Sequence, residues 1–361
     1  MRFTHYRLRM CATALGVLSL FGSAGVARAQ PAAGTSGTLS IPAFTMPLSN
    51  YMSPEARRNF QGVLEETAQA PKYNGSIASI EAGRAYFRKF SEADVVRDER
   101  LYPVNIQNQT IGGVPTVVVT PKQDVAEAQQ HRVLISLHGG AFQWNRGPGL
   151  LTYAIPVASV GRIKVISVDY RQGFEHVFPA ASEDVAAVYR ELLKSYPAKN
   201  IGIYGCSAGG ILTGEAVAWF IHDKLPVPGA IGMFCGAVVP IGGDSSHLAP
   251  LLVGAAPASS SKKPPEMSYF KGTKATDPLV WPGNSPSLLA KFPPTLLITG
   301  TRDFTMSSEL ESEQLLTSAG VDVELHVWDG MWHSFFSNPD MPESKEAYAV
   351  MVKFFDKHLS K

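Results

Sequence analysis

One stretch decides the fold of this chain: Ile201-Gly202-Ile203-Tyr204-Gly205-Cys206-Ser207-Ala208-Gly209. Its first half has the apolar character of a buried strand, and the residues from Ile211 to Phe220 continue it as a helix. Ser207 therefore stands at a sharp turn between a strand and a helix, where flanking glycines avoid side-chain clashes. This position favours a nucleophile, and the alternative is a serine that only caps the helix.

Three further pieces occur in a fixed order around this turn. The run His138-Gly139-Gly140-Ala141-Phe142 precedes the serine, and Asp303 and then His333 follow it, each after an apolar run. Acyl transfer needs a nucleophile, a base, a group that orients the base, and N–H donors for the oxyanion. The ordered set predicts Ser207 as nucleophile, His333 as base, Asp303 as orienting acid, and Gly139, Gly140 and Ala208 as oxyanion-hole donors.

Some of these roles have rivals in the sequence. Asp329 lies closer to His333 along the chain, but Asp303 is favoured because it follows the penultimate strand. His326 lies inside a predicted strand and is expected to be packed there. His138 ends a strand, and we expect it to hold the glycine loop by a hydrogen bond rather than to titrate.

Apolar runs and helical segments alternate from about residue 100 onward. Runs that are apolar at nearly every position indicate strands buried on both faces, as in a parallel sheet. The predicted fold is therefore α/β, an open, mostly parallel doubly wound sheet with helices on both faces and a helical cap. The predicted strands are 114–120, 133–137, 165–168, 201–205, 230–234, 295–299 and 321–327, and the predicted helices of this region are 180–195, 208–222, 305–319 and 343–358.

The cap is predicted from two segments outside that alternation. The first segment, residues 51–98, contains two helical stretches, 54–70 and 77–96. The second is a Gly/Pro/Ser-rich insertion at about 236–290, which interrupts the alternation of strands and helices in the catalytic domain, 99–361. Both are expected to cover a pocket, and the alternative for the first is an ordinary packed extension. Four aromatic residues near the loops are candidate pocket residues or simply core: Phe142, Trp144, Trp332 and Phe335.

The chain begins with the pattern of a secretory signal peptide. Residues 1–29 combine a basic start, an apolar run from Met10 to Phe21 and the small-x-small site Ala27-Arg28-Ala29. We expect export to the periplasm or the medium without a stable membrane anchor, an uncleaved anchor being the alternative. A flexible lead-in, 30–50, follows.

Composition narrows the class of protein further. With 45% hydrophobic and 17% charged residues, the 361-residue chain favours a large folded core over general disorder. The net charge is +1, and loss of the four leader arginines makes it −3, so no basic surface suggests nucleic acid. The mature chain keeps Cys206 and Cys235, expected as buried free thiols, with a disulfide as the alternative. No cluster has metal-ligand spacing, so we expect no metal.

With these motifs in hand, the chain resembles the hormone-sensitive-lipase-like family of α/β-hydrolases, from about residue 100 to the C-terminus. That family often reads D-Y-R-L-A-P-E-H-P-F-P-A-A-x-E-D, where this chain reads Asp169-Tyr170-Arg171-Gln172-Gly173-Phe174-Glu175-His176-Val177-Phe178-Pro179-Ala180-Ala181-Ser182-Glu183-Asp184. The family's His-Gly-Gly-Gly loop matches at His138, Gly139 and Gly140, and its Gly-Asp-Ser-Ala-Gly elbow matches at Gly205, Ser207, Ala208 and Gly209.

The chain departs from the family pattern at a few positions. Ala141 replaces the third glycine, Cys206 replaces the common aspartate, and Gln172-Gly173-Phe174 replaces Leu-Ala-Pro. The resemblance implies the α/β-hydrolase fold and a cofactor-free carboxylesterase for small-molecule esters with short or medium acyl chains. The same machinery would also serve a lactonase or an amidase. A non-catalytic small-molecule-binding module is the remaining alternative, and His333 speaks against it.

Overall fold

The computed structural model describes residues 32–33, 39–40, 45–74, 76–255 and 267–360, and the predicted signal peptide lies outside them. The chain divides into two compact units, Met1–Pro47 and Leu48–Lys361. In the first unit, strands β1 (Ala32–Ala33) and β2 (Leu39–Ser40) pair antiparallel. Among the helices of the described segments, none is long and apolar enough to cross a membrane.

Within the described residues of the second unit, eight strands form one sheet in the order β10-β9-β8-β7-β5-β6-β4-β3. The strands from β10 to β6 run parallel, whereas β4 pairs antiparallel with both of its neighbours. The predicted class, α/β with a mostly parallel sheet, is thus confirmed. The strands are β3 (Val104–Ile111), β4 (Val114–Pro121), β5 (Val133–Leu137), β6 (Val165–Val168), β7 (Ile201–Cys206), β8 (Ala230–Phe234), β9 (Thr295–Arg302) and β10 (Val323–Trp332).

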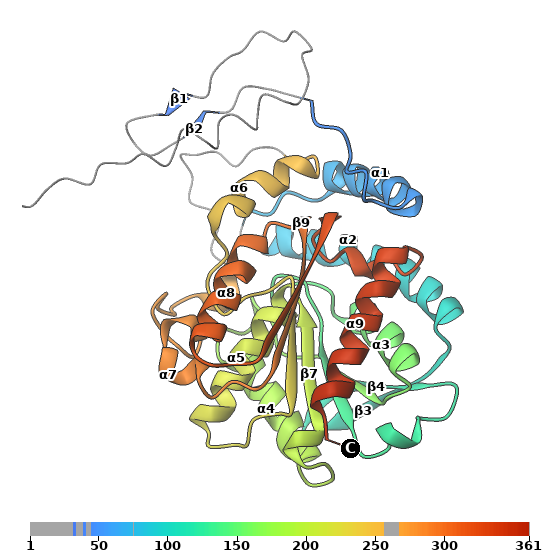
Figure 1. The fold of residues 1–361 in the computed structure, drawn as a ribbon, viewed down its shortest axis with the longest axis vertical. Helices are drawn as coiled ribbons and strands as arrows, with labels where there is room; N and C mark the ends of the chain where they lie inside the picture. Colours follow the sequence, from blue (N-terminus) through green and yellow to red (C-terminus); the bar gives the residue numbers. More distant parts are fainter. Residues whose placement is uncertain (1–31, 34–38, 41–44, 75, 256–266, 361) are drawn as a thin grey trace, which may run out of the picture. The chain divides into compact units, whose positions relative to one another are not determined.

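Helices cover both faces of this sheet, and further helices lie over one end of it (Figure 1). One face carries α4, α5 and α8, and the other carries α3 and α9. The helices are α1 (Pro54–Gln69), α2 (Ile77–Leu101), α3 (Ala154–Gly161), α4 (Ala180–Leu192), α5 (Ala208–His222), α6 (Gly243–Leu252), α7 (Pro286–Leu289), α8 (Met306–Ser318) and α9 (Pro342–His358).

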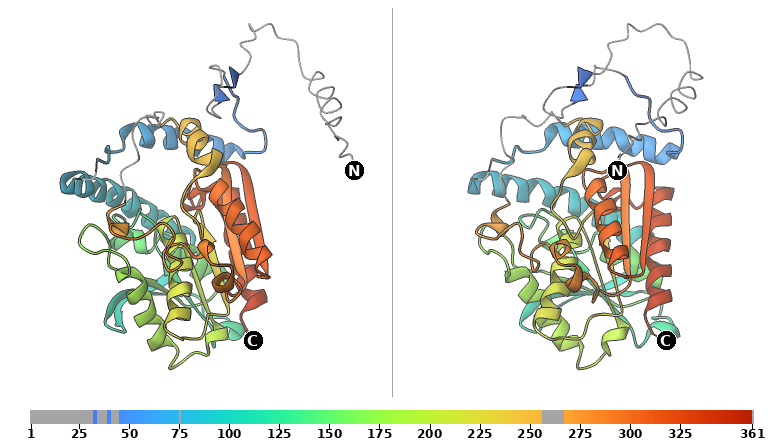
Figure 2. Two further views of the ribbon diagram at one scale, coloured as in Figure 1. Left: turned by 90° about the vertical axis from the view of Figure 1, so that its left-hand side faces the viewer. Right: turned by 60° about the vertical axis from the view of Figure 1, so that its left-hand side comes forward.

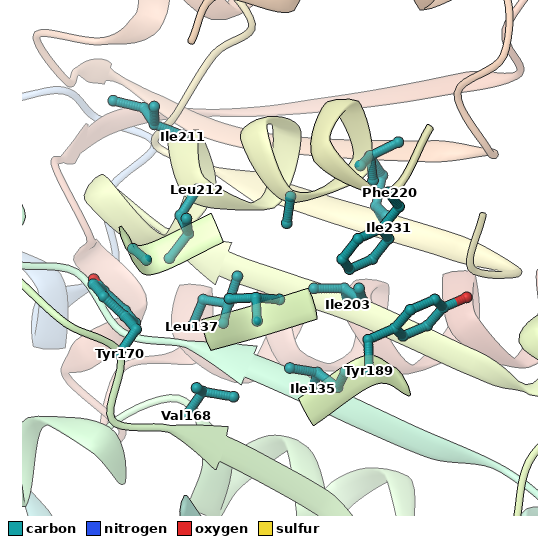
Figure 3. Close-up of a cluster of buried hydrophobic side chains, with 14 of the residues drawn as sticks. Ile135, Leu137, Val168, Tyr170, Tyr189, Ile203, Ile211, Leu212, Phe220 and Ile231 are labelled. Atoms are coloured by element: carbon teal, nitrogen blue, oxygen red, sulfur yellow. The ribbon is translucent and has the colours of Figure 1, made fainter. Parts of the chain in front are cut away.

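The central strands are buried on both faces, which explains their uninterrupted apolar sequences. In β5, Ile135 packs into the core on the α5 side and Leu134 into the core on the α9 side. Figure 3 shows the first of these cores, where Ile135, Ile203 and Ile231 meet Phe220. Burying large apolar side chains in this way stabilises the fold by about 1.5 to 3 kcal/mol each.

The carboxyl ends of the parallel strands carry the loops that matter for function. Ser207 follows β7, Asp303 follows β9 and His333 follows β10. Helices α1, α2 and α6 lie over this end of the sheet in both views of Figure 2. Loops at the carboxyl ends of such a sheet meet at one edge, which is where α/β folds place ligands.

The structure also contains elements that the sequence did not predict, among them β3 and α3. Strand β3 is exposed along most of its length and carries polar side chains, so it lacks the apolar run of a buried strand. Helix α3 spans eight residues and contains Pro156, and both features weaken a helical pattern. The predicted strand 295–299 continues to Arg302, and the predicted helix 77–96 continues to Leu101.

Candidate active site

The turn that holds Ser207 is tight enough to require glycine on both sides. Ser207 has φ 58°, a conformation rare for residues with a side chain, and its N–H donates to Phe234 O at 2.8 Å. A Cβ added to Gly209 would lie 2.0 Å from Leu137 O, and one added to Gly205 would lie 2.4 Å from the Gly209 backbone. The Gly-x-Ser-x-Gly spacing is therefore a steric requirement of packing α5 against β5 and β7.

His333 and Asp303 are brought together from loops 30 positions apart in the chain. His333 Nδ1 lies 2.7 Å from Asp303 Oδ1, and the aspartate is fully buried while the imidazole is partly exposed. The backbone N–H of Thr305 donates to the same Oδ1 at 2.9 Å and the Thr305 hydroxyl donates to it at 2.7 Å. Donors thus hold this carboxylate in one orientation, with Oδ1 toward the histidine.

The pair also shifts the proton affinities of its two members in opposite directions. Burial raises the pKa of Asp303, but the His333 charge and the hydrogen bonds from His333 and Thr305 outweigh burial, and the pKa is lowered. Burial lowers the pKa of His333, but the Asp303 charge and hydrogen bond prevail and raise it above 6.5. An ionised aspartate next to a basic imidazole is the arrangement a general base requires.

The rival acid and base lie elsewhere. Asp329 accepts hydrogen bonds from Ser49 and, at 3.3 Å, from Thr301, and it does not contact His333. The expectation that His326 is packed inside its strand is wrong, because its side chain is 38% exposed on β10, where it lies 3.8 Å from Glu324. The geometry therefore pairs His333 with Asp303.

A second carboxyl group, that of Glu309, is connected to Asp303 through Thr305. The Thr305 hydroxyl lies 3.0 Å from Glu309 Oε1, and Glu309 is fully buried in α8. Burial, together with the Asp303 charge, raises the pKa of Glu309 well above 4.5. A neutral Glu309 can donate its proton to the Thr305 hydroxyl, which in turn donates to Asp303. Sequence reasoning missed Glu309, and its only signal is an acid on the buried face of a helix.

The glycine loop after β5 presents unpaired N–H groups next to the serine. Within the described segments, no protein acceptor binds the N–H of Gly139, Gly140 or Ala208. A Cβ on Gly139 would lie 3.2 Å from the Ser207 Cβ, so the loop approaches the nucleophile closely. Free N–H groups beside Ser207 are the donors that an oxyanion on a carbonyl bonded to this serine would need.

His138 anchors this loop from the inside. Its Nδ1 lies 2.7 Å from Gly139 O, and its backbone carbonyl accepts a hydrogen bond from the Tyr170 hydroxyl at 2.6 Å. The two rings stack with centroids 4.3 Å apart. Burial lowers the pKa of His138 to about 4, so the ring is neutral at physiological pH and acts by holding the loop.

Helix α2 is fastened to the same loop by one arginine. Arg84 donates to Gln143 O at 2.8 Å and to Gly173 O at 3.2 Å, and it pairs with Glu175 at 2.6 Å. Gln172, which replaces a leucine of the family pattern, donates to Trp144 O at 2.8 Å. The loop that departs most from the family is therefore tied to the oxyanion loop and to the cap helix.

Ser207 and His333 open into one cavity of about 820 Å³. Its inner wall comes from the loops after the strands, and its outer wall from α1, α2 and α6. Trp144 and Trp332 line it, whereas Phe142 stacks on Tyr269 and Phe335 packs with Phe336 in the core. A separate cavity of about 860 Å³ beside β3 and β4 includes none of the three predicted catalytic residues.

The predicted nucleophile, Ser207, and the predicted base, His333, are not yet in hydrogen-bond contact in this structure. Among the described residues, no hydrogen bond links the Ser207 hydroxyl to His333, although both face the cavity. Such bonds often tighten only when substrate binds.

Two free thiols pack beside the imidazole. Cys206 Sγ lies 2.8 Å from the Ser334 hydroxyl, and Cys235 Sγ accepts from Ser334 N at 3.3 Å. Cys235, Asp303 and His333 each offer a ligand atom within 4.8 Å of the others. Because His333 Nδ1 is already bonded to Asp303, this cluster fits an acid–base pair with a packed thiol better than a metal site.

The chain is similar in sequence and structure to proteins that share this arrangement of elements. The model of the alpha/beta hydrolase fold family matches residues 134–337, and the chain belongs to that family. Its motifs resemble those of the hormone-sensitive-lipase-like branch of this fold. An acetyl-hydrolase of Streptomyces hygroscopicus is 26% identical over 251 residues, which is 68% of this chain and 83% of the relative.

Two solved structures extend the likeness over most of the chain. The crystal structure of an esterase E25 has a TM-score of 0.75 at 27% identity and covers 90% of this chain and 99% of its own. A hormone-sensitive lipase from a metagenome library has a TM-score of 0.68 at 25% identity, covering 84% and 98%.

Proposed function

We propose that this protein is a serine carboxylesterase that cleaves short- to medium-chain acyl esters through an acyl-enzyme on Ser207. One observation carries the proposal: Ser207 and the His333–Asp303 pair face the same cavity, beside N–H groups that have no acceptor in the described part of the chain. The family, the acetyl-hydrolase relative and the structural likeness to an esterase support ester hydrolysis as the reaction class.

The reaction follows from the positions of these groups. His333 Nε2 takes the proton of Ser207 as the hydroxyl oxygen attacks the ester carbonyl, and Asp303 stabilises the imidazolium that forms. The oxyanion accepts hydrogen bonds from the N–H groups of the glycine loop and Ala208, each worth about 100-fold in rate or more. The imidazolium then protonates the leaving alcohol, and water releases the acid by the same steps in reverse.

The proposed acyl range rests on the cavity and on the relative. A volume of about 820 Å³ holds a small ester with room to spare, and aromatic side chains supply apolar walls. The relative from Streptomyces is named for the acetyl group, a short acyl chain. Short and medium chains are therefore preferred in this proposal over long ones.

The test is hydrolysis of p-nitrophenyl esters from acetate to palmitate, with wild type beside Ser207→Ala. We expect activity to peak at short or medium chains and to be lost in the variant, while circular dichroism stays unchanged. A fluorophosphonate probe should label the wild type and not the variant. Equal rates in the two proteins would refute the acyl-enzyme mechanism. Labelling of the wild type without activity on any ester would indicate that the substrate is a lactone or an amide.

We further propose that the enzyme is exported through residues 1–29 to the periplasm or the medium and has no stable membrane anchor. Support comes from the basic start, the apolar run and the Ala27-Arg28-Ala29 site. Cell fractionation with N-terminal sequencing tests this. A mature chain that begins near residue 30 is expected, and an intact leader in the membrane fraction would overturn the proposal.

A further inference from the structure

Arg302 occupies an unusual position in the cavity wall. It is the last residue of β9, directly before Asp303, and only 5% of its surface is exposed. Its guanidinium lies 4.6 Å from the centre of the Phe60 ring of α1, so one face of the cation is held by an aromatic ring. The side chain lines the same cavity as Ser207 and His333.

No protein group in the described segments pairs with this cation. The Arg302 side chain donates to no acceptor there and has no carboxylate within ion-pair distance. Burial lowers its pKa and the Asp329 charge raises it, yet an arginine stays charged in either case. Asp329 itself is occupied by Ser49 and Thr301. A largely buried cation without a partner is costly, so the site favours an anion.

The other two arginines of the wall are already matched. Arg58 pairs with Glu55 at 2.9 Å, and Arg97 pairs with Asp94 at 2.7 Å. The wall also contains Glu66, whose pKa is raised by burial and by the Asp94 charge. Arg302 thus differs from the other two arginines of the wall in lacking a carboxylate among the described residues.

We propose that Arg302 is an anion-binding subsite that takes a carboxylate carried by the ester substrate, either at the far end of the acyl chain or on the alcohol. This inference rests on the ester hydrolysis proposed above. A guanidinium matches a carboxylate through two parallel hydrogen bonds. One cation balances one negative charge, so a carboxylate fits better than a phosphate dianion, whose second charge would stay buried without a partner.

The experiment compares charged and neutral esters of similar size. Monoethyl adipate against ethyl heptanoate tests the acyl side, and 4-acetoxybenzoate against phenyl acetate tests the alcohol side. For each pair, the ratio of kcat/KM for the charged ester to that for the neutral ester is measured in wild type and in Arg302→Met. Because the ratio is compared between proteins, the intrinsic reactivities of the esters cancel.

Arg302→Met should lower this ratio by about 10- to 100-fold for one of the two pairs, mainly through KM, as expected for one charge-assisted interaction. Arg302→Lys should keep part of the preference, because lysine keeps the positive charge but lacks the paired N–H donors of the guanidinium. Arg58→Met, which removes a matched cation of the same wall, is the control and should leave the ratio near the wild-type value. High salt should weaken the wild-type preference.

The outcomes separate this inference from the proposed reaction. If Arg302→Met retains fluorophosphonate labelling and leaves both ratios unchanged, the subsite does not exist and Arg302 serves to anchor α1 through Phe60. If the wild type neither labels nor hydrolyses any ester, the proposed reaction itself fails. Thermal melting of Arg302→Met and Arg302→Lys shows whether either variant has lost its fold.

Discussion

Replacing Thr305 by valine would remove one hydroxyl that two carboxyl groups share. That hydroxyl lies 2.7 Å from Asp303 Oδ1 and 3.0 Å from Glu309 Oε1, and all three side chains are buried. A hydrogen bond to a charged acceptor contributes about 1.5 to 3 kcal/mol, and a buried polar atom left without its partner costs about 1 to 3 kcal/mol. Since both effects arise from one atom they do not simply add, and we expect the free energy of unfolding to fall by about 3 kcal/mol.

For a folded unit of this size, that loss corresponds to a decrease in Tm of roughly 5 °C. The assay is thermal unfolding followed by circular dichroism, together with kcat/KM on a p-nitrophenyl ester. Valine keeps the shape of threonine, and the backbone N–H of Thr305 still donates to Asp303. The activity should fall while Ser207 can still be labelled, because His333 loses part of the support for its acid.

Thr213→Val is the matched control. Thr213 is also fully buried, but its hydroxyl donates to a neutral acceptor, Gly209 O, at 2.8 Å. Its loss should cost only about 1 kcal/mol. Equal destabilisation by the two substitutions would refute the reasoning, since it would mean that the charge of Asp303 adds nothing to the bond.

Two further predictions concern pH. Because the base must be neutral and the pKa of His333 is raised above 6.5, kcat/KM should fall on the acid side with an apparent pKa above that value; a profile that is flat down to pH 6.5 would contradict this. Asp98 of α2 is fully buried, neither carboxyl oxygen has a partner among the described residues, and burial raises its pKa from 3.8 to about 8. The contribution of Asp98 to the free energy of unfolding is fully present below pH 3.8. As the pH rises from there to about 8, this contribution falls by about 1.4 kcal/mol per pH unit. Asp98→Asn should remove this slope in urea unfolding between about pH 5 and about pH 8, and an unchanged slope would show that Asp98 is ionised in the folded state.

The sequence allowed the central sheet and the loops of the site to be predicted because those features depend on local patterns. The buried strands have uninterrupted apolar sequences, and the Ser207 turn has glycines that sterics require. The pairing of His333 with Asp303 rather than Asp329 followed from the order of the strands, and the geometry agrees with it.

The remaining features depend on contacts that the sequence pattern does not show. Glu309 is notable only because α8 brings it next to Thr305, which also binds Asp303. Arg302 is notable only because Phe60 of α1 lies over it and no carboxylate of the described residues lies within ion-pair distance. Arg84 lies in a stretch that the sequence predicted only as a helix, yet its partners come from two separate loops. No local pattern records the contacts of Arg302 and Arg84, because their partners lie tens or hundreds of positions away, and the burial that gives Glu309 its role comes from the fold as a whole.

The way α2 is fastened to the glycine loop bears on how the substrate range of such an enzyme can change. The family match begins at residue 134, so α1 and α2, two of the helices that form the outer wall of the cavity, precede the matched part of the chain, whereas α6 lies within it. Arg84 holds α2 through the Glu175 carboxylate and through the backbone carbonyls of Gln143 and Gly173, and every amino-acid sequence offers such carbonyls. A new N-terminal segment with one arginine in the right place would therefore keep the two carbonyl contacts whatever side chains lie below it. Exchange of this segment would change part of the outer wall of the cavity while the loops that carry Ser207, Asp303 and His333 stay in place.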